Sequence, residues 1–226
     1  MFKDLYQNFQ PILSRLELKI SEEEFLSSLE KLYLKHKEIN DIHNLTRITS
    51  KEDFFEKHIV DSLMIGLVDP QILTGAFRIA DVGCGGGFPC LPLSMVNSDL
   101  EICGIESLGK KVSAVNEIAD FCGFDNMEVY KYRAREAGRV EGFITGFDIV
   151  TARAVATAEV LIKECRQMVK PGGRMIFYKT PEAIEKELSL AERDSKKHKF
   201  TLELSEKFLL SEASGERQFF ILTKES

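Results

Sequence analysis

One short stretch constrains the fold of this chain more than any other, because it joins an apolar run to a glycine-rich loop. Residues 78–82 (RIADV) have the length and apolar character of a buried parallel strand, and residues 83–89 (GCGGGFP) follow directly. The glycines of this loop can adopt positive φ and let a ligand approach the backbone closely. The stretch therefore predicts an α/β domain with a ligand held against the loop.

The loop does not fit the dinucleotide-binding fingerprint. That pattern, G-x-G-x-x-G, takes Gly or Ala at its sixth position, but the sixth residue counted from Gly83 is Phe88. An NAD-dependent oxidoreductase is therefore the least favoured interpretation. The segment reads D-x-G-x-G-x-G, which resembles motif I of the class I S-adenosylmethionine (SAM) methyltransferases. The resemblance implies a cofactor site that includes Asp81, Gly83, Gly85, Gly87 and Phe88, whereas a structural turn is the alternative for a glycine loop taken alone.

A second carboxylate supports a cofactor site. The apolar run from Leu100 to Ile105 ends in Glu106, about twenty residues after the glycine loop. Doubly wound folds place the acid that binds ribose hydroxyls at this position. A solvated residue at a strand end is the other interpretation, and the agreement of the two features favours cofactor binding.

Strands and helices alternate after Gly75, which is typical of a mostly parallel sheet with helices on both faces. We expect a Rossmann-like α/β fold with seven strands, the last two antiparallel at the edge. The predicted strands are 78–82, 100–105, 127–131, 147–152 and 174–179, with edge runs at 200–210 and 218–223. The predicted helices are about 89–97, 109–122, 134–138, 156–169 and 181–197. Residues 170–173 (KPGG) predict a sharp turn before the fifth strand.

The first part of the chain is predicted to be helical. Ser21 and Glu24 form a capping-box pattern ahead of apolar residues at helical spacing, and Ser50 with Asp53 opens a second helix. We expect residues 1–66 to form a helical extension packed on a methyltransferase domain of residues 67–226.

Composition limits the possible functions. The formal charge of −6 argues against a protein that binds nucleic acid over its whole surface, but residues 126–180 contain ten basic and six acidic residues. A local basic face is therefore expected. No apolar stretch reaches the length of a membrane span and the N-terminus lacks a signal-peptide core, so we expect a cytoplasmic protein with no membrane partner. The five cysteines and four histidines have no metal-ligand spacing, and no metal site is predicted.

Several motifs together resemble one family. They are Asn44-Leu45-Thr46, His58-Ile59-x-Asp61-Ser62, the glycine loop, Ser107-Leu108-x-Lys110-Lys111 and Arg153-Ala154. In this order they resemble the small-subunit ribosomal RNA guanine-N7 methyltransferases, also called glucose-inhibited division protein B. The resemblance implies SAM-dependent methylation of N7 of one guanine in the decoding-region loop of bacterial 16S rRNA. The implied partner is 16S rRNA or the small ribosomal subunit, and we expect a monomer without a metal.

The resemblance also implies roles for individual residues. Gly83 and Phe88 line the cofactor, Glu106 binds its ribose, and Ala134 and Arg135 lie at its adenine, although many members have an acid where this chain has Arg135. Arg153 is expected near the methionine part of the cofactor and the reacting centre. Arg153 or Lys179 would donate to O6 of the guanine, while Asn44 would cover the site. Candidate RNA contacts are Arg47, Lys110, Lys111, Arg133, Arg135 and Arg139.

Two other functions stay open at this point. A SAM-dependent methyltransferase could act on a small molecule or a protein, and a nucleotide-binding or RNA-binding module could lack catalysis. The basic excess of residues 126–180 and the Asn44-Leu45-Thr46 segment speak against the first of these. Retention of Arg153 and of the loop glycines speaks against the second.

Overall fold

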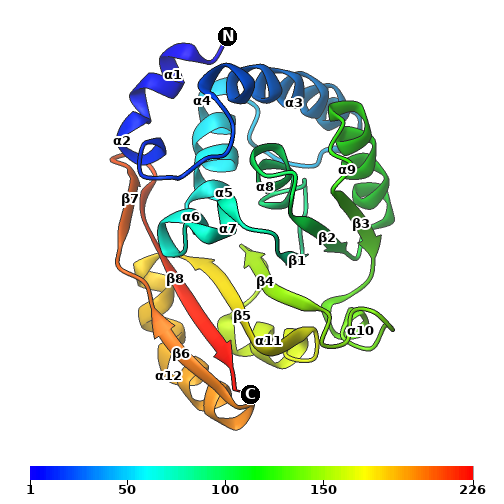
Figure 1. Cartoon of the computed structure of the whole chain (residues 1–226), viewed down its shortest axis with the longest axis vertical. Helices are drawn as coiled ribbons and strands as arrows, with labels where there is room; N and C mark the ends of the chain where they lie inside the picture. The colour runs from blue at the N-terminus through cyan, green and yellow to red at the C-terminus, as the bar shows by residue number, and fades with distance from the viewer. Residues whose placement is uncertain (226) are drawn as a thin grey trace.

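The computed structural model describes residues 1–225, in which one mixed sheet is covered by helices on both faces (Figure 1). The strand order is β3-β2-β1-β4-β5-β8-β6, and β7 pairs with the start of β8. The strands are β1 (Arg78–Val82), β2 (Glu101–Glu106), β3 (Met127–Lys131), β4 (Phe147–Arg153), β5 (Val169–Lys179), β6 (Phe200–Leu204), β7 (Phe208–Ser211) and β8 (Gly215–Lys224).

Helices make up the N-terminal part and the crossovers between strands. Before β1 they are α1 (Lys3–Asn8), α2 (Gln10–Leu13), α3 (Glu22–His43), α4 (Lys51–Asp53), η1 (Phe54–Val60), α5 (Asp61–Leu63), α6 (Ile65–Val68) and α7 (Gln71–Thr74). The later helices are α8 (Cys90–Val96), α9 (Gly109–Cys122), α10 (Ala134–Ala137), α11 (Ala158–Cys165) and α12 (Pro181–Lys197). No helix in the described part of the chain is long and apolar enough to cross a membrane.

The order of the parallel strands determines where a ligand can bind. β1 pairs with β2 on one side and with β4 on the other, so Val82 at the end of β1 lies opposite both Ile105 and Ala152. The chain therefore runs outward in opposite directions from β1, which makes this point the topological switch of the sheet. Ligands of open α/β sheets bind in the crevice beyond the carboxyl ends of the strands at such a switch.

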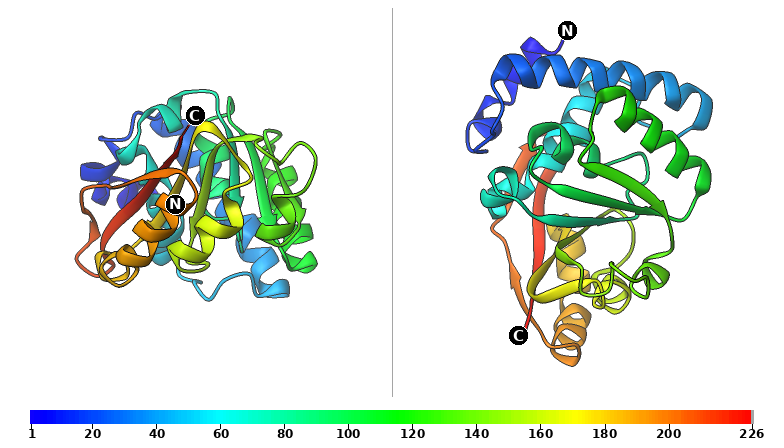
Figure 2. Two further views of the ribbon diagram at one scale, coloured as in Figure 1. Left: turned by 90° about the horizontal axis from the view of Figure 1, so that it is seen from below. Right: turned by 45° about the vertical axis from the view of Figure 1, so that its right-hand side comes forward.

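Each face of the sheet has its own apolar core. The N-terminal helices, α8 and α9 share one buried cluster with one sheet face, and α10 to α12 share another with the opposite face. Figure 2 shows helices on both sides of the sheet and α3 lying beside α9. Lys35 of α3 pairs with Glu117 of α9 at 2.8 Å, so the N-terminal helices and the sheet form one packed body.

The predicted start of α3 agrees with the structure. Ser21 accepts a hydrogen bond from the Glu24 backbone and the Glu24 carboxylate accepts one from the Ser21 backbone, which satisfies two N–H groups at the helix start. The apolar stripe that begins at Phe25 and Leu29 is fully buried. The helix ends at His43, and the capping residue Asn44 has a left-handed φ of 51°.

Three details differ from the sequence-based expectations. The described sheet has eight strands rather than seven, because the run 200–210 is divided between β6 and β7. β5 starts at Val169: Phe147 pairs with Val169 and Ile149 with Arg174, so the predicted turn at 170–173 is a bulge within the strand. The helix that was predicted to open at Ser50 is π-helical over Phe54–Val60. This form has wider turns and often occurs at functional sites.

Candidate functional site

The main site candidate is a cavity of about 670 Å³ at the topological switch. The ends of β1, β2 and β4 and the glycine loop form one side of it, and the segment from Leu45 to Asp61 forms another. Its lining includes Leu45, Thr46, Lys57, His58, Asp61, Gly83, Gly85, Phe88, Glu106, Lys111, Tyr132, Arg133, Ala134, Arg153, Ala154 and Arg217.

The glycine loop reaches its shape through positions that exclude a side chain. Gly83 has a φ of 69°, and a Cβ there would lie 2.5 Å from Val155. Gly87 has a φ of 95°, and a Cβ there would overlap the side chain of Leu91. The loop needs glycine at both positions, although Gly87 does not line the cavity itself.

Asp81 lies beneath the glycine loop and does not line the cavity. Its carboxylate accepts hydrogen bonds from the Cys90 backbone and from the Thr151 hydroxyl, each at 3.2 Å. Burial raises the pKa of Asp81 to about 6. The resemblance implied that Asp81 belongs to the cofactor site, whereas its two hydrogen bonds join the end of β1 to the start of α8 and to β4 beneath the loop.

Glu106 ends β2 and faces the cavity. One carboxylate oxygen accepts from the Gly85 backbone at 3.2 Å, and the other accepts from the Leu108 backbone at 2.9 Å and the Ser107 hydroxyl at 3.3 Å. These bonds fix the side chain at the edge of the glycine loop. The structure thus brings together the two features that the sequence placed about twenty residues apart.

Two neutral histidines join the N-terminal helices to the glycine loop. The His58 ring stacks on Phe88 with ring centroids 4.0 Å apart and an interplanar angle of 6°. His36 donates from Nε2 to the Gly86 carbonyl at 3.0 Å. Burial lowers the pKa of His36 to about 4 and, together with the charge of Arg153, lowers that of His58 to about 2. Both imidazoles are therefore uncharged at neutral pH.

Arg153 is held by the segment that the sequence motif His58-Ile59-x-Asp61 marks. Its Nη1 donates to the Lys57 carbonyl at 2.6 Å and to Asp61 Oδ2 at 2.9 Å. Lys57 and His58 belong to the π-helical turn, so the irregular helix presents both groups to the end of β4. This ion pair is largely buried and fixes the guanidinium at the cavity wall.

Arg217 is a cavity residue that was not predicted from the sequence. Its Nε donates to Asp61 Oδ1 at 2.7 Å, so Asp61 lies between Arg153 and Arg217. Its position follows from a long-range strand pairing: β8 runs antiparallel to β5, and the start of an antiparallel strand lies beside the carboxyl end of its neighbour. Gln218 indeed pairs with Lys179 at the end of β5.

The predicted catalytic residues Lys179 and Asn44 lie outside this cavity. The Lys179 ammonium donates to the Ala156 carbonyl at 2.7 Å and pairs with Glu187 at 2.9 Å. Asn44 lines a neighbouring cavity of about 690 Å³, together with Arg47. Lys179 is therefore committed to a structural ion pair, while Asn44 stands at the rim of the site.

The other predicted contacts divide into two groups. Lys111, Arg133 and Ala134 line the cavity, and Lys111 also lines the neighbouring one. Exposed side chains outside the main cavity lining are those of Lys110, Arg135 and Arg139. Tyr132 lines the cavity next to Arg133 and was not predicted.

Comparisons with known proteins agree on a methyltransferase. The model of the rRNA small subunit methyltransferase G family matches residues 26–212. Ribosomal RNA small subunit methyltransferase G of Lactobacillus delbrueckii is 33% identical over 180 residues, which cover 78% of this chain and 74% of the relative. The protein of the same name from Listeria monocytogenes is 32% identical over 219 residues, 96% of this chain and 90% of its own.

Solved structures show the same fold at low sequence identity. Fibrillarin of Aeropyrum pernix, crystallised with natively bound SAM, superposes with a TM-score of 0.55 at 15% identity. The match covers 72% of each chain. The architecture described above is that of a class I SAM-dependent methyltransferase.

Proposed function

The chain belongs to the rRNA small subunit methyltransferase G family, and we propose that it methylates N7 of one guanine in the decoding-region loop of 16S rRNA. It is a SAM-dependent methyltransferase with an RNA substrate. The observation that carries the finer proposal is the division of one cavity: the glycine loop and Glu106 form one wall, and two arginines joined by Asp61 form another.

The residues of the first wall suit the cofactor. Glu106 presents a buried carboxylate at the end of β2, the position from which ribose hydroxyls are bound in such folds. Gly83 and Gly85 leave room for close approach at the loop, and Tyr132, Arg133 and Ala134 would border the adenine. When bound there, SAM supplies an electrophilic methyl group on a positively charged sulfur.

The second wall suits the base. Guanine N7 has an in-plane lone pair and no proton, so the chain needs no general base. Arg153 and Arg217 carry two positive charges against the single charge of Asp61, and their N–H groups can donate to O6 of the guanine. This would fix the ring with N7 toward the cofactor, and orientation of this kind can contribute several kcal/mol to catalysis.

We assign RNA binding to the basic side chains that line the opening of the cavity. Lys111 lines both the main cavity and the one lined by Asn44 and Arg47, and Arg133 lines the main cavity. A base inside a stack must be extruded to enter such a cavity, at a cost of a few kcal/mol. Phosphate contacts from these side chains would offset that cost.

Transfer of labelled methyl tests the proposal. Purified enzyme, labelled SAM and small ribosomal subunits from a strain that lacks the modification should give one methyl group per particle, carried by the RNA. Subunits already modified serve as the control and should accept none. Label in ribosomal protein, or equal label in both kinds of particle, would contradict the proposed substrate.

A further inference from the structure

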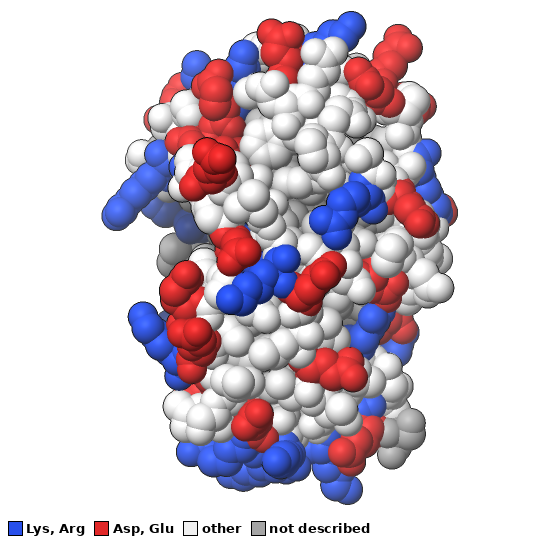
Figure 3. Space-filling view, turned by 90° about the vertical axis from the view of Figure 1, so that its left-hand side faces the viewer, with Lys and Arg blue, Asp and Glu red and all other residues white. Residues whose placement is uncertain are grey.

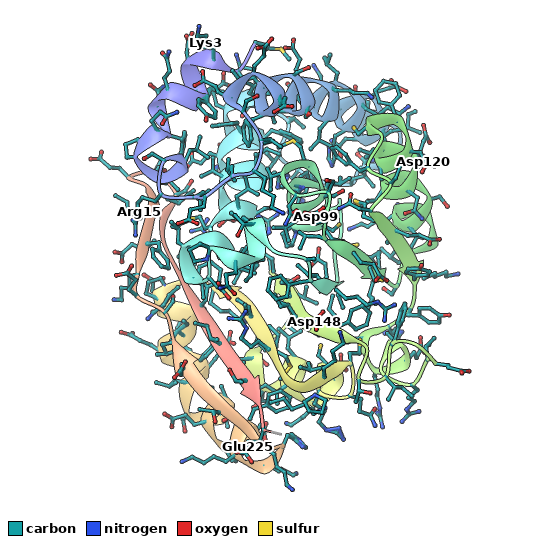
Figure 4. All side chains as sticks on the ribbon, viewed as in Figure 1. Lys3, Arg15, Asp99, Asp120, Asp148 and Glu225 are labelled. Carbon is teal, nitrogen blue, oxygen red and sulfur yellow. The ribbon has the colours of Figure 1, made fainter. Side chains whose placement is uncertain are left out.

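A second cationic cavity lies at the amino-terminal ends of the parallel strands, whereas the site described above lies at their carboxyl ends. It has a volume of about 370 Å³, and its basic lining residues are Arg166, Lys197, Lys199 and Lys224. They come from the end of α11, the end of α12, the turn before β6 and the end of β8. We call this the distal basic cavity. Figure 3 shows Lys and Arg gathered at the lower end of the molecule, where Figure 4 labels Glu225 beside the end of β8.

The charges of this cavity have little compensation. No acidic residue lines it within the described part of the chain. Asp194 lies in the same region, but its carboxylate already pairs with Lys163 at 3.0 Å and with Arg193 at 3.3 Å. Glu225 is exposed, and the bond it makes here is from its backbone to the Lys199 carbonyl. Four cationic side chains thus face one hollow.

Helix dipoles compensate only part of this positive charge. Arg166 and Lys197 lie at helix C-termini, each of which carries roughly half a negative charge. Two such ends supply roughly one negative charge against four positive ones, which leaves an excess of roughly three. Lys224 donates to the carbonyls of Arg166 and Val169, at 3.2 and 2.7 Å, and burial and the nearby Arg166 lower its pKa. The repulsion among these groups would be relieved by an anion.

The backbone of the cavity is also unusual. Lys199 has a φ of 60° and Thr145 a φ of 47°, a left-handed conformation that costs about 1–2 kcal/mol for residues other than glycine. Both residues line the distal basic cavity. Asn44 and Ala154, which share this conformation, line the two cavities of the proposed RNA and cofactor site. Strain of this kind clusters at binding sites.

We propose that the distal basic cavity binds a phosphodiester group of the rRNA substrate. The inference rests on the proposed function, because it takes the RNA as the source of the phosphate. β4 leads from the region of Thr145 to Arg153 in the main cavity, and its seven residues span about 20 Å. That distance corresponds to roughly six stacked nucleotides at about 3.4 Å each. The chain therefore holds a folded RNA at two separate points.

The test is a charge-removal variant, Arg166→Gln with Lys197→Gln and Lys199→Gln, which leaves the structural Lys224 in place. The matched control changes Lys3, Lys37 and Lys207 to Gln, which removes the same charge from exposed positions elsewhere. KM for unmodified small subunits, kcat, and SAM affinity by calorimetry are measured at several salt concentrations. Thermal unfolding confirms that each variant is folded.

We expect KM to rise at least tenfold in the triple variant while kcat and SAM affinity stay within twofold of wild type. The plot of log(kcat/KM) against log[salt] should become less steep by about 0.7–0.9 for each phosphate that the variant no longer neutralises. Lys197→Arg with Lys199→Arg keeps the charge and should behave as wild type.

Equal KM and equal salt dependence in the triple variant and the control would overturn the inference. Failure of the proposed function is a separate result, because the wild-type enzyme itself would then not methylate the subunits.

Discussion

Asp61 accepts hydrogen bonds from two arginines that the chain supplies from different strands. Arg153 comes from the end of β4 and Arg217 from the start of β8, and the carboxylate uses one oxygen for each. Removing one partner of a buried pair is costly, because the other charge loses its compensation. The three side chains are therefore best understood as one unit that fixes two donors at the cavity wall.

Arg153→Ala tests the part of this unit nearest the glycine loop. We expect kcat to fall about 100-fold, since a charged donor aligned with the base is lost. Steady-state kinetics with small subunits and calorimetry with SAM separate turnover from cofactor binding. Arg139→Ala is the control, because Arg139 is exposed and does not line the cavity. Unchanged turnover together with unchanged SAM affinity would show that the assignment of Arg153 is wrong.

Gly83→Ala tests the shape of the loop. The new Cβ would lie 2.5 Å from Val155, so this side chain must move within the cavity. We expect SAM affinity to fall at least tenfold, and Val155→Ala in the same chain to restore most of it. Gly142→Ala is the matched control for Gly83→Ala, because Gly142 also has a positive φ, of 82°, but has open space around its Cβ position. It should cost about 1–2 kcal/mol of stability and leave SAM affinity unchanged.

At the scale of elements, the N-terminal helices are part of the site. His36 of α3 and His58 of η1 contact Gly86 and Phe88 of the glycine loop, so these helices set the position of the cavity floor. Both imidazoles are held neutral by burial, which links the docking of the helices to pH.

The sign of this pH dependence follows from the direction of the shifts. The folded-state pKa values of His36 and His58 lie below the ordinary 6.5, so the unfolded chain binds more protons and stability is lost as the pH falls below about 6.5. Asp81 acts in the opposite direction, because its pKa is raised from 3.8 to about 6 and protonation favours the folded state. His198, whose pKa is also lowered by burial, acts in the same direction as the other two histidines, so the net effect is a loss.

We expect the free energy of unfolding to fall by roughly 2 kcal/mol between pH 7 and pH 5.5. Urea unfolding followed by circular dichroism measures it. His36→Gln keeps a donor for the Gly86 carbonyl but removes one titrating group. In this variant the free energy of unfolding should fall by no more than about half as much as in wild type. A fall as large as that of wild type would contradict the assignment to the histidines.

The elements also explain how far the sequence predicts the site. Glu106 and the glycine loop could be predicted because local pattern and strand order determine their positions, and Arg153 because it follows a predicted strand and belongs to the Arg153-Ala154 motif of the family that the chain resembles. Lys179 also ends a parallel strand, but its ammonium turns to Glu187, a partner on α12 that sequence spacing does not reveal. Arg217 depended on the pairing of β8 with β5, a long-range contact. The division of 200–210 into β6 and β7 depended on the same pairing.

The whole molecule carries a net charge of −6, yet its basic side chains gather at both ends of the parallel strands. From this charge distribution we expect the enzyme to favour a folded RNA that can reach several cationic points at once, and to bind unstructured RNA weakly. The sequence predicted a local basic face within residues 126–180. It could not predict the distal basic cavity, whose lining residues come from four separate parts of the chain and meet only in the folded molecule.

The proposed reaction places a methyl group on N7 of one guanine, and mapping of the methylated nucleotide decides whether it does. Small subunits methylated by the purified enzyme are extracted, and the RNA is cleaved by chemistry that acts only at N7-methylguanine. We expect one new cleavage, at a guanine in the decoding-region loop of 16S rRNA, absent without enzyme or without SAM. Methylated RNA that resists this cleavage, or that is cleaved outside this loop, would contradict the proposed reaction.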